Sequence, residues 1–262
     1  MRSLSIAATG MQAQQLNVEV ISNNLANLTT TAYKMQRPEF QDLLYQEQRR
    51  VGGTSNEAGT IAPAGIQLGL GVRTGAVYRV QEQGTLKETG NQFDVAIRGK
   101  GYFVVELPNG VQGYTRAGAF QINQDGEIVT QQGNLVSPGI TIPSDASRVN
   151  ISATGVVEAF IDGQPDSQNL GQLELANFVN ENGLRALGEN LFEETTSSGD
   201  PLTAFPGDEG YGTILQGFLE DSNVDSVKEI TNLIVAQRSY EMNSKVITTA
   251  DEMMRTTSQL RS

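Results

Sequence analysis

Glycine and proline are distributed very unevenly along this 262-residue chain, and their distribution limits what each part can fold into. Of 28 glycines only Gly10 lies before residue 52, and none lies after Gly217. All prolines except Pro38 lie between residues 63 and 206. In a helix interior, glycine costs about 1 kcal/mol and proline about 3 kcal/mol. The two ends can therefore be helical. In the middle, frequent glycines and prolines indicate turns between short strands, which is typical of a β domain.

The N-terminal end carries an apolar stripe whose spacing alternates between three and four residues. Its members are Leu4, Ala7, Met11, Gln14, Val18, Ile21, Leu25 and Leu28. This spacing places them on one helix face and predicts a helix over residues 4–27, with Ser3 or Ser5 as its N-cap.

A similar, slightly drifting stripe occupies the C-terminal end. It consists of Val227, Ile230, Ile234, Val235, Met242, Val246, Met253 and Leu260. Asp225 or Ser226 is the expected N-cap, and Glu229 would complete a capping box with Ser226. Neither narrow stripe buries enough alone to offset the entropy of ordering a helix. The two helices must pair with each other in a closed stalk, or with helices of neighbouring subunits.

Short alternating segments fill the middle of the chain and predict antiparallel strands. They are residues 72–80, 93–97, 102–106, 119–122, 127–129, 156–161 and 173–178. The expected fold class is α+β, with paired, long, coiled-coil-like N- and C-terminal helices flanking a central, mostly antiparallel β domain. The expected parts are an N-terminal helical segment 1–44, an extended connector 45–66, the β domain 67–216 and a C-terminal helical segment 217–262.

The chain contains no His, Cys or Trp. Their absence excludes disulfides, thiolate nucleophiles, imidazole bases and Cys/His metal centres, so neither a metal nor a cofactor is expected. Thirty acidic against 18 basic residues give a net charge of −12, which excludes a general nucleic-acid binder. Eighteen of the acids and only eight of the bases lie within residues 51–208. Because acids spread over an acidic surface are the ordinary case, we predict no catalytic residue, and a carboxylate-dependent cell-wall hydrolase is the less favoured alternative.

Several sequence runs resemble those of one known family. At the ends they are residues 10–15, 21–27, 31–37, 217–225 and 236–245, and in the middle 90–97, 99–103 and 114–118. Together they resemble the bacterial flagellar rod and hook axial proteins, in the same order over nearly the whole chain. One departure is Ala32, which stands where that family commonly has glycine and argues against a left-handed turn there.

The resemblance implies a structural subunit and no enzyme. In that family the terminal helices form the inner coiled-coil layer of a helical tube, and the β domain forms the outer layer. The implied role is a self-assembling subunit of the rod, the drive shaft of the flagellar basal body; a proximal rod or hook component is the alternative. The N-terminus has no sustained apolar run and therefore does not have the pattern of a Sec-type signal peptide. The resemblance implies export through the flagellar type III apparatus without a cleaved signal peptide.

The resemblance also implies the partners and an assembly interface. The partners are other copies of the chain, neighbouring proximal rod and hook proteins, surrounding ring (bushing) proteins and the export apparatus, in a basal body that spans the periplasm. The interface residues are Leu4, Met11, Val18, Ile21, Asn23, Asn24, Leu25, Asn27, Ser222, Asn223, Val224, Val227, Ile230, Ile234, Gln237, Tyr240, Met242, Asn243, Val246 and Met253.

Overall fold

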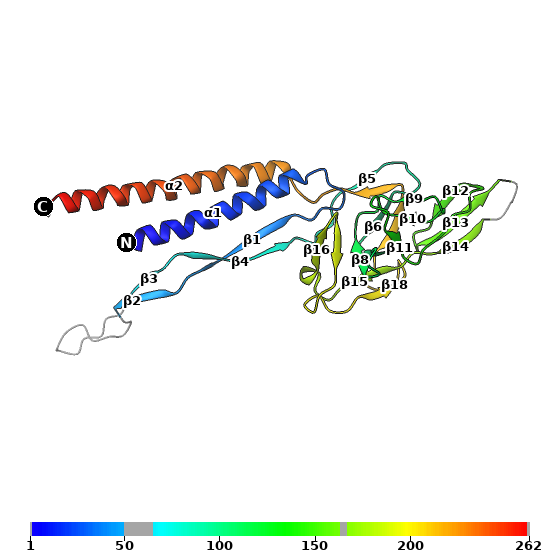
Figure 1. Cartoon of the computed structure of the whole chain (residues 1–262), viewed down its shortest axis with the longest axis horizontal. Helices are drawn as coiled ribbons and strands as arrows, with labels where there is room; N and C mark the ends of the chain where they lie inside the picture. The colour runs from blue at the N-terminus through cyan, green and yellow to red at the C-terminus, as the bar shows by residue number, and fades with distance from the viewer. Residues whose placement is uncertain (1, 50–64, 163–166, 261–262) are drawn as a thin grey trace. The chain divides into compact units, whose positions relative to one another are not determined.

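The computed structural model describes residues 2–49, 65–162 and 167–260, which divide into two compact units. The helix–ribbon unit comprises Met1–Ala26, Gln36–Tyr78 and Asp225–Ser262, and the β unit comprises Asn27–Met35 and Arg79–Val224. The element order confirms the α+β class, with a helix near each end and a mostly antiparallel β domain between them (Figure 1). Each unit is thus built from segments that are far apart in the sequence.

Both predicted terminal helices are present. α1 spans Arg2–Ala26 and α2 spans Ser226–Gln259. Asp225 is the N-cap of α2, because its carboxylate accepts hydrogen bonds from two backbone N–H groups of the first turn, at 2.9 and 3.2 Å. Ser226 is therefore the first helical residue, and the predicted capping box with Glu229 is wrong. Glu229 is instead buried against α1.

A ribbon of paired strands belongs to the same unit as the helices. β1 (Gln36–Asp42) pairs with β4 (Val72–Arg79), and β2 (Tyr45–Arg49) pairs antiparallel with β3 (Ile66–Gly69). β1 also packs against α1. The sequence analysis predicts only β4. β1 and β2 are mostly polar, and β3 is a stretch of four residues, Ile-Gln-Leu-Gly, that starts at the end of the expected connector. Residues 50–64, the middle of the expected connector 45–66, lie outside the described residues.

The β unit contains a nine-stranded antiparallel sheet. Seven strands run in the order β16-β17-β8-β7-β11-β10-β9, and β15 pairs with β7 and with the edge strand β18. The strands are β7 (Tyr102–Glu106), β8 (Gln112–Thr115), β9 (Gln121–Ile122), β10 (Ile128–Val129), β11 (Leu135–Val136), β15 (Leu175–Asn177), β16 (Arg185–Gly188), β17 (Leu191–Glu193) and β18 (Leu202–Ala204).

Smaller sheets complete the β unit. One has three antiparallel strands, β12 (Ala146–Ile151), β13 (Val156–Ile161) and β14 (Gln168–Gln172). Two others are antiparallel pairs, β19 (Thr213–Gln216) with β6 (Val95–Arg98), and β20 (Phe218–Glu220) with β5 (Leu86–Glu88). A short 3₁₀ helix, η1, spans Glu181–Gly183. The predicted segments 102–106 and 156–161 coincide with β7 and β13.

β7 separates two hydrophobic clusters. Phe103 and Val105 belong to the main core of the β unit, whereas Tyr102 and Val104 pack in a second, smaller cluster with Phe178. Successive side chains of a strand point to opposite faces, so this alternation buries both faces of β7. The aromatic rings of Tyr102 and Phe178 meet edge to face at 6.0 Å.

Ala32 adopts a left-handed backbone conformation, with φ at 57°. The expectation that alanine argues against such a turn here is therefore wrong. Ala32 is buried, and its N–H donates to the carbonyl oxygen of Glu220 at 2.7 Å. Contacts within the β unit thus hold a conformation that costs a residue with a Cβ about 1–2 kcal/mol.

Candidate assembly interface

α1 and α2 pack against each other as an antiparallel pair (Figure 1). At one end, Nδ2 of Asn24 donates a hydrogen bond to Oε2 of Glu229 at 3.0 Å. Farther along, Gly10 lies so close to Asn243 that a Cβ on Gly10 would lie 3.0 Å from the Asn243 Nδ2. Fourteen residues separate these two contact points on each helix. The helices therefore keep one register over about four turns.

Small and polar residues form the face of α2 that meets α1, here called the inner face. Glu229, Ala236, Asn243 and Ala250 recur every seven residues, and both alanines are buried. Glu229 and Ala236 were not predicted for this face, because glutamate and alanine do not stand out in an apolar stripe. The signal that could have revealed the inner face in the sequence is the seven-residue repeat of these four small or polar residues.

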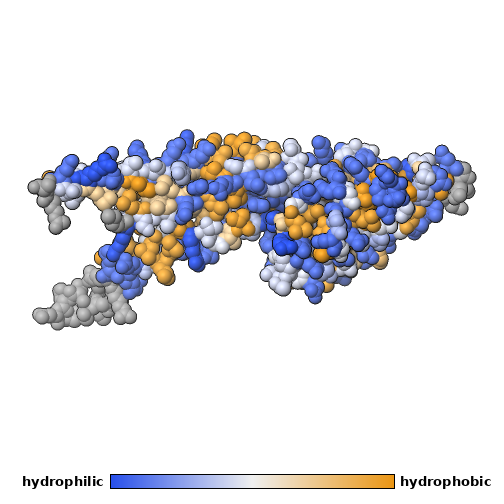
Figure 2. Space-filling view, in the orientation of Figure 1, coloured by the Kyte–Doolittle hydropathy of each residue, from blue (hydrophilic) through white to orange (hydrophobic). Residues whose placement is uncertain are grey.

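The predicted apolar stripe of α2 does not face α1. We define the outer stripe as Val227, Ile230, Ile234, Met242, Val246 and Met253, which are between 45 and 73% exposed. Gln237 and Tyr240 are exposed as well. A helix advances about 100° per residue, so Val227, Ile230 and Ile234 lie well away from the inner face, whereas Val246 and Met253 lie along its edge, beside Ala250. Figure 2 shows hydrophobic residues along the helices and the ribbon. The helix pair therefore leaves a long apolar surface uncovered.

The predicted interface residues of α1 are more covered than those of α2. Ile21 is buried, Leu4, Met11, Val18 and Leu25 are half-buried, and Asn23 is exposed. Asn24, which was also predicted, is buried, and so are Ala13 and Val20, which were not. The covered face of α1 is broader than the stripe because α1 contacts both α2 and β1.

Two asparagines that we expected at subunit contacts are engaged within the chain. The Asn24 Oδ1 accepts from the Gln36 N–H, and its Nδ2 donates to the Gln36 carbonyl, both at 2.8 Å. The Asn223 Oδ1 accepts from the Met35 N–H at 2.7 Å, and its Nδ2 donates to the Val80 carbonyl at 2.9 Å. Each side-chain amide thus satisfies backbone groups of its own unit.

The remaining predicted positions near the helix ends are at least partly covered. Asn27 and Ser222 are half-buried, and Val224 is buried. The Asn27 Oδ1 accepts a hydrogen bond from the Thr30 hydroxyl at 3.1 Å. Contacts of these residues with a neighbouring subunit stay predictions.

The ribbon carries a second uncovered apolar surface. Leu44 and Tyr45 are 83 and 58% exposed, and Ile66, Leu68 and Leu70 are exposed as well. These side chains flank residues 50–64 in the sequence. The helix–ribbon unit therefore presents hydrophobic side chains on two of its parts.

A buried charge cluster in the β unit was not predicted. The Glu220 carboxylate is 1% exposed and lies 2.6 Å from the Lys34 Nζ and 3.0 Å from the Arg116 Nε. It also accepts the Gly84 N–H at 3.0 Å, and the Arg116 guanidinium donates to carbonyls of the 99–101 turn at 2.9 Å. Each of the three charged residues lies inside one of the runs that carry the family resemblance.

The electrostatics of this cluster favour ionised Glu220. Burial by itself raises the pKa of Glu220, but the charges of Arg116 and Lys34 outweigh it and hold the pKa below its ordinary value. Burial lowers the pKa of Lys34, which the Glu220 carboxylate opposes only in part. The cluster ties the segment that precedes β1 to β20, so its role is to hold the β unit together.

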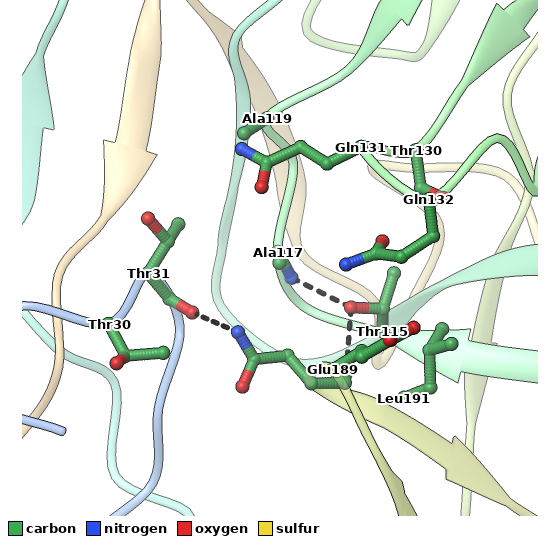
Figure 3. Close-up of a pocket in the computed structure, with 11 residues that line it drawn as sticks. Thr30, Thr31, Thr115, Ala117, Ala119, Thr130, Gln131, Gln132, Glu189 and Leu191 are labelled. Carbon is green, nitrogen blue, oxygen red and sulfur yellow. Dashed lines mark hydrogen bonds between the residues drawn. The ribbon is translucent and has the colours of Figure 1, made fainter.

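A cavity of about 240 Å³ in the β unit is lined mainly by Thr, Gln and Asn side chains (Figure 3). The Asn190 Nδ2 donates to the Thr31 carbonyl, and the Thr115 hydroxyl donates to the Asn190 carbonyl, both at 2.9 Å. Glu189 is the one carboxylate among its lining residues. A glycan hydrolase needs two facing carboxyl groups, so this cavity lacks the groups for that chemistry.

Two further searches cover the described residues. No helix within them is long and apolar enough to cross a membrane. Across residues 2–49, 65–162 and 167–260, no three or more potential metal-ligating side chains come together. The candidate functional site is therefore the uncovered apolar surfaces of the helix–ribbon unit, which bring together many of the exposed large apolar side chains.

Three protein families match this sequence. Residues 4–34 match the family described as flagella basal body rod protein. Residues 96–159 match the flagellar hook protein FlgE/F/G D1 domain, and residues 215–260 match the flagellar basal body rod FlgEFG protein C-terminal family.

Characterised relatives are similar over the full length of the chain. The flagellar basal-body rod protein FlgG of Caulobacter vibrioides is 57% identical over 262 residues, which is 100% of both chains. The protein of the same name from Agrobacterium fabrum is 56% identical over 253 residues, 97% of each chain. The one from Bacillus subtilis is 38% identical over 260 residues, again 97% of each.

Proposed function

The chain belongs to the flagellar basal-body rod protein family, and from this premise we propose that it self-assembles helically into the rigid distal rod of the flagellar basal body. It is a structural protein and not an enzyme. In this role it transmits torque toward the hook. The observation that carries the proposal is the outer stripe of α2, which the chain's own helix pair leaves exposed.

The outer stripe is well placed to bind a neighbouring copy. From Val227 to Met253 it extends roughly 39 Å along the helix at about 1.5 Å per residue. Covering apolar area stabilises association by about 25 cal/mol per Å². When the stripe on one copy binds a different face of the next copy, the contact is heterologous. If the rotation between neighbouring copies does not close a ring, repeating this contact builds a helical assembly. We infer that residues 1–44 and 217–262 form the inner coiled-coil layer of the tube, and residues 67–216 its outer layer.

The connector has a proposed role of its own. We infer that residues 45–66 bridge adjacent subunits and resist bending, which a drive shaft requires. Support comes from the exposed apolar side chains of Leu44, Tyr45 and Leu68 on either side of the undescribed stretch. These side chains gain burial only if another surface covers them.

The proposed partners and location follow from the same role. We infer contacts with the neighbouring proximal rod and hook proteins and with the surrounding ring proteins, in a rod that spans the periplasm. We also infer that the flagellar export apparatus exports the chain without a cleaved signal peptide. The acidity of residues 51–208 supports rotation within a ring, because a hydrated, charged outer layer adheres weakly to a surrounding surface.

The test compares two double variants of the outer stripe. I230S/I234S makes the stripe polar, whereas the matched control I230L/I234L keeps it apolar at similar volume. Both side chains are about half exposed and lie away from the inner face, so we expect both variants to keep the wild-type helix signal in circular dichroism.

Electron microscopy at rising protein concentration gives the readout. We expect straight tubes from the wild type and from I230L/I234L, and none from I230S/I234S at the same concentration. A wild-type chain that stays monomeric with both helices formed would contradict the proposal. So would tubes of I230S/I234S that form at the wild-type concentration.

A further inference from the structure

Three methionines lie on exposed parts of α2. Met242 and Met253 belong to the outer stripe and are 62 and 60% exposed, and Met254 is 36% exposed. Met11 and Met35, in contrast, are half-buried. Methionine oxidation is easiest where an oxidant reaches the sulfur. Among the methionines that the structure describes, these three thioethers are therefore the most accessible.

The register of the helix pair places Met253 and Met254 at the end of α2. The two contact points between the helices place residue 251 opposite Arg2, the first residue of α1. α2 continues to Gln259, so its last two turns extend past the end of α1 (Figure 1). Met253 and Met254 lie in these turns, beyond the described residues of α1.

Building on the proposed assembly role of the outer stripe, we propose that Met242, Met253 and Met254 form an oxidation-sensitive site that controls subunit addition. The oxidant is a peroxide. One S–O bond forms as the O–O bond breaks, the sulfur loses two electrons, and the peroxide is reduced to water. Each thioether becomes a sulfoxide, which is polar and accepts hydrogen bonds.

The effect on assembly follows from desolvation. In the free chain a sulfoxide at these positions stays hydrated, and the helix pair is unchanged. In a tube the outer stripe loses water, so a sulfoxide there gives up hydration that a thioether does not need. The exposed side-chain donors three or four residues from Met242 are Arg238 and Lys245, which would themselves have to leave water to reach the new oxygen. We therefore expect the critical concentration for assembly to rise about tenfold or more.

The experiment uses the full-length chain, hydrogen peroxide and mapping of sulfoxides by mass spectrometry. The matched control is M242L/M253L/M254L, because leucine and methionine have similar volumes. We expect peroxide to raise the critical concentration of the wild type and to leave that of the variant unchanged. Methionine sulfoxide reductases should restore the assembly of the oxidised wild type. This reversal would attribute the effect to methionine sulfoxide even if the triple variant does not fold.

The outcomes separate this inference from the proposed function. Oxidised wild type that assembles at its untreated critical concentration overturns the inference. A triple variant that peroxide inhibits as strongly as wild type overturns it as well. In both cases the untreated chain still assembles, so the proposed function stands. An untreated chain that never assembles refutes the proposed function, and the inference with it.

Discussion

Replacing Glu220 with glutamine tests the buried charge cluster. The substitution leaves the Lys34 and Arg116 charges buried without their counter-charge, and the carboxylate between them is 1% exposed. Removing one partner of a buried ion pair costs about 3–5 kcal/mol. The glutamine oxygen can still accept the Gly84 N–H, which recovers about 1 kcal/mol. We therefore expect E220Q to lower the free energy of unfolding by about 3 kcal/mol.

Urea unfolding at neutral pH measures this loss. The chain has no Trp, so the near-UV circular dichroism of the buried Tyr102 and Tyr114 reports on the β unit. The matched control is E193Q, which breaks the surface pair of Glu193 with Arg185. An exposed ion pair contributes less than about 1 kcal/mol, so E193Q should lower the free energy of unfolding only slightly. A loss in E220Q no larger than in E193Q would refute the reasoning.

The pH dependence gives a second readout with a definite sign. The native pKa of Glu220 lies below its ordinary value, so its ionisation stabilises the fold above the unfolded pKa, about 4.3. That contribution is lost as the pH falls through the lower native pKa. The difference in unfolding free energy between wild type and E220Q should therefore shrink on acidification. A difference that stays constant at low pH contradicts ionised Glu220 as its source.

Three further changes test other features. Ala32→Gly should stabilise the β unit by about 1 kcal/mol in urea unfolding, because glycine adopts the left-handed conformation freely; a destabilised variant contradicts this. Gly10→Ala should raise the melting temperature of the helix signal more in an Asn243→Ala background than in wild type, since Asn243 crowds the new Cβ; equal gains argue against the contact. Burial, with the nearby Glu194 charge, raises the pKa of Tyr114 to about 12, so the folded state keeps a proton that the unfolded state loses above pH 10. The free energy of unfolding should thus fall as the pH rises through that window, and it should fall less in Y114F than in the wild type. An equal loss in Y114F at alkaline pH would contradict this.

The parts of the fold that sequence reasoning predicted are those with a local signal. The terminal helices follow from the scarcity of glycine, the absence of proline and residue spacing, and β7 and β13 follow from alternation between turn residues. The mostly polar strands β1 and β2 have no such alternation, and β3 has only four residues. Ala32 shows a tertiary contact overriding a local preference, because its hydrogen bond to Glu220 joins positions 188 residues apart.

The candidate site was only partly predictable for the same reason. Val227, Ile230 and Ile234 were identified from their spacing, but spacing alone cannot say which face of a helix its own partner covers. The charge cluster joins residues 34, 116 and 220, and no pattern in the sequence links positions so far apart. Only the fold brings them together.

The equal spacing of the two helix contacts also constrains how chains of this kind can change in length. Asn24 must meet Glu229 while Gly10 meets Asn243. A deletion between the contacts in one helix would shift every later pair unless the other helix lost the same number of residues. Among relatives, an insertion or deletion between residues 10 and 24 should therefore be accompanied by a matching one between residues 229 and 243.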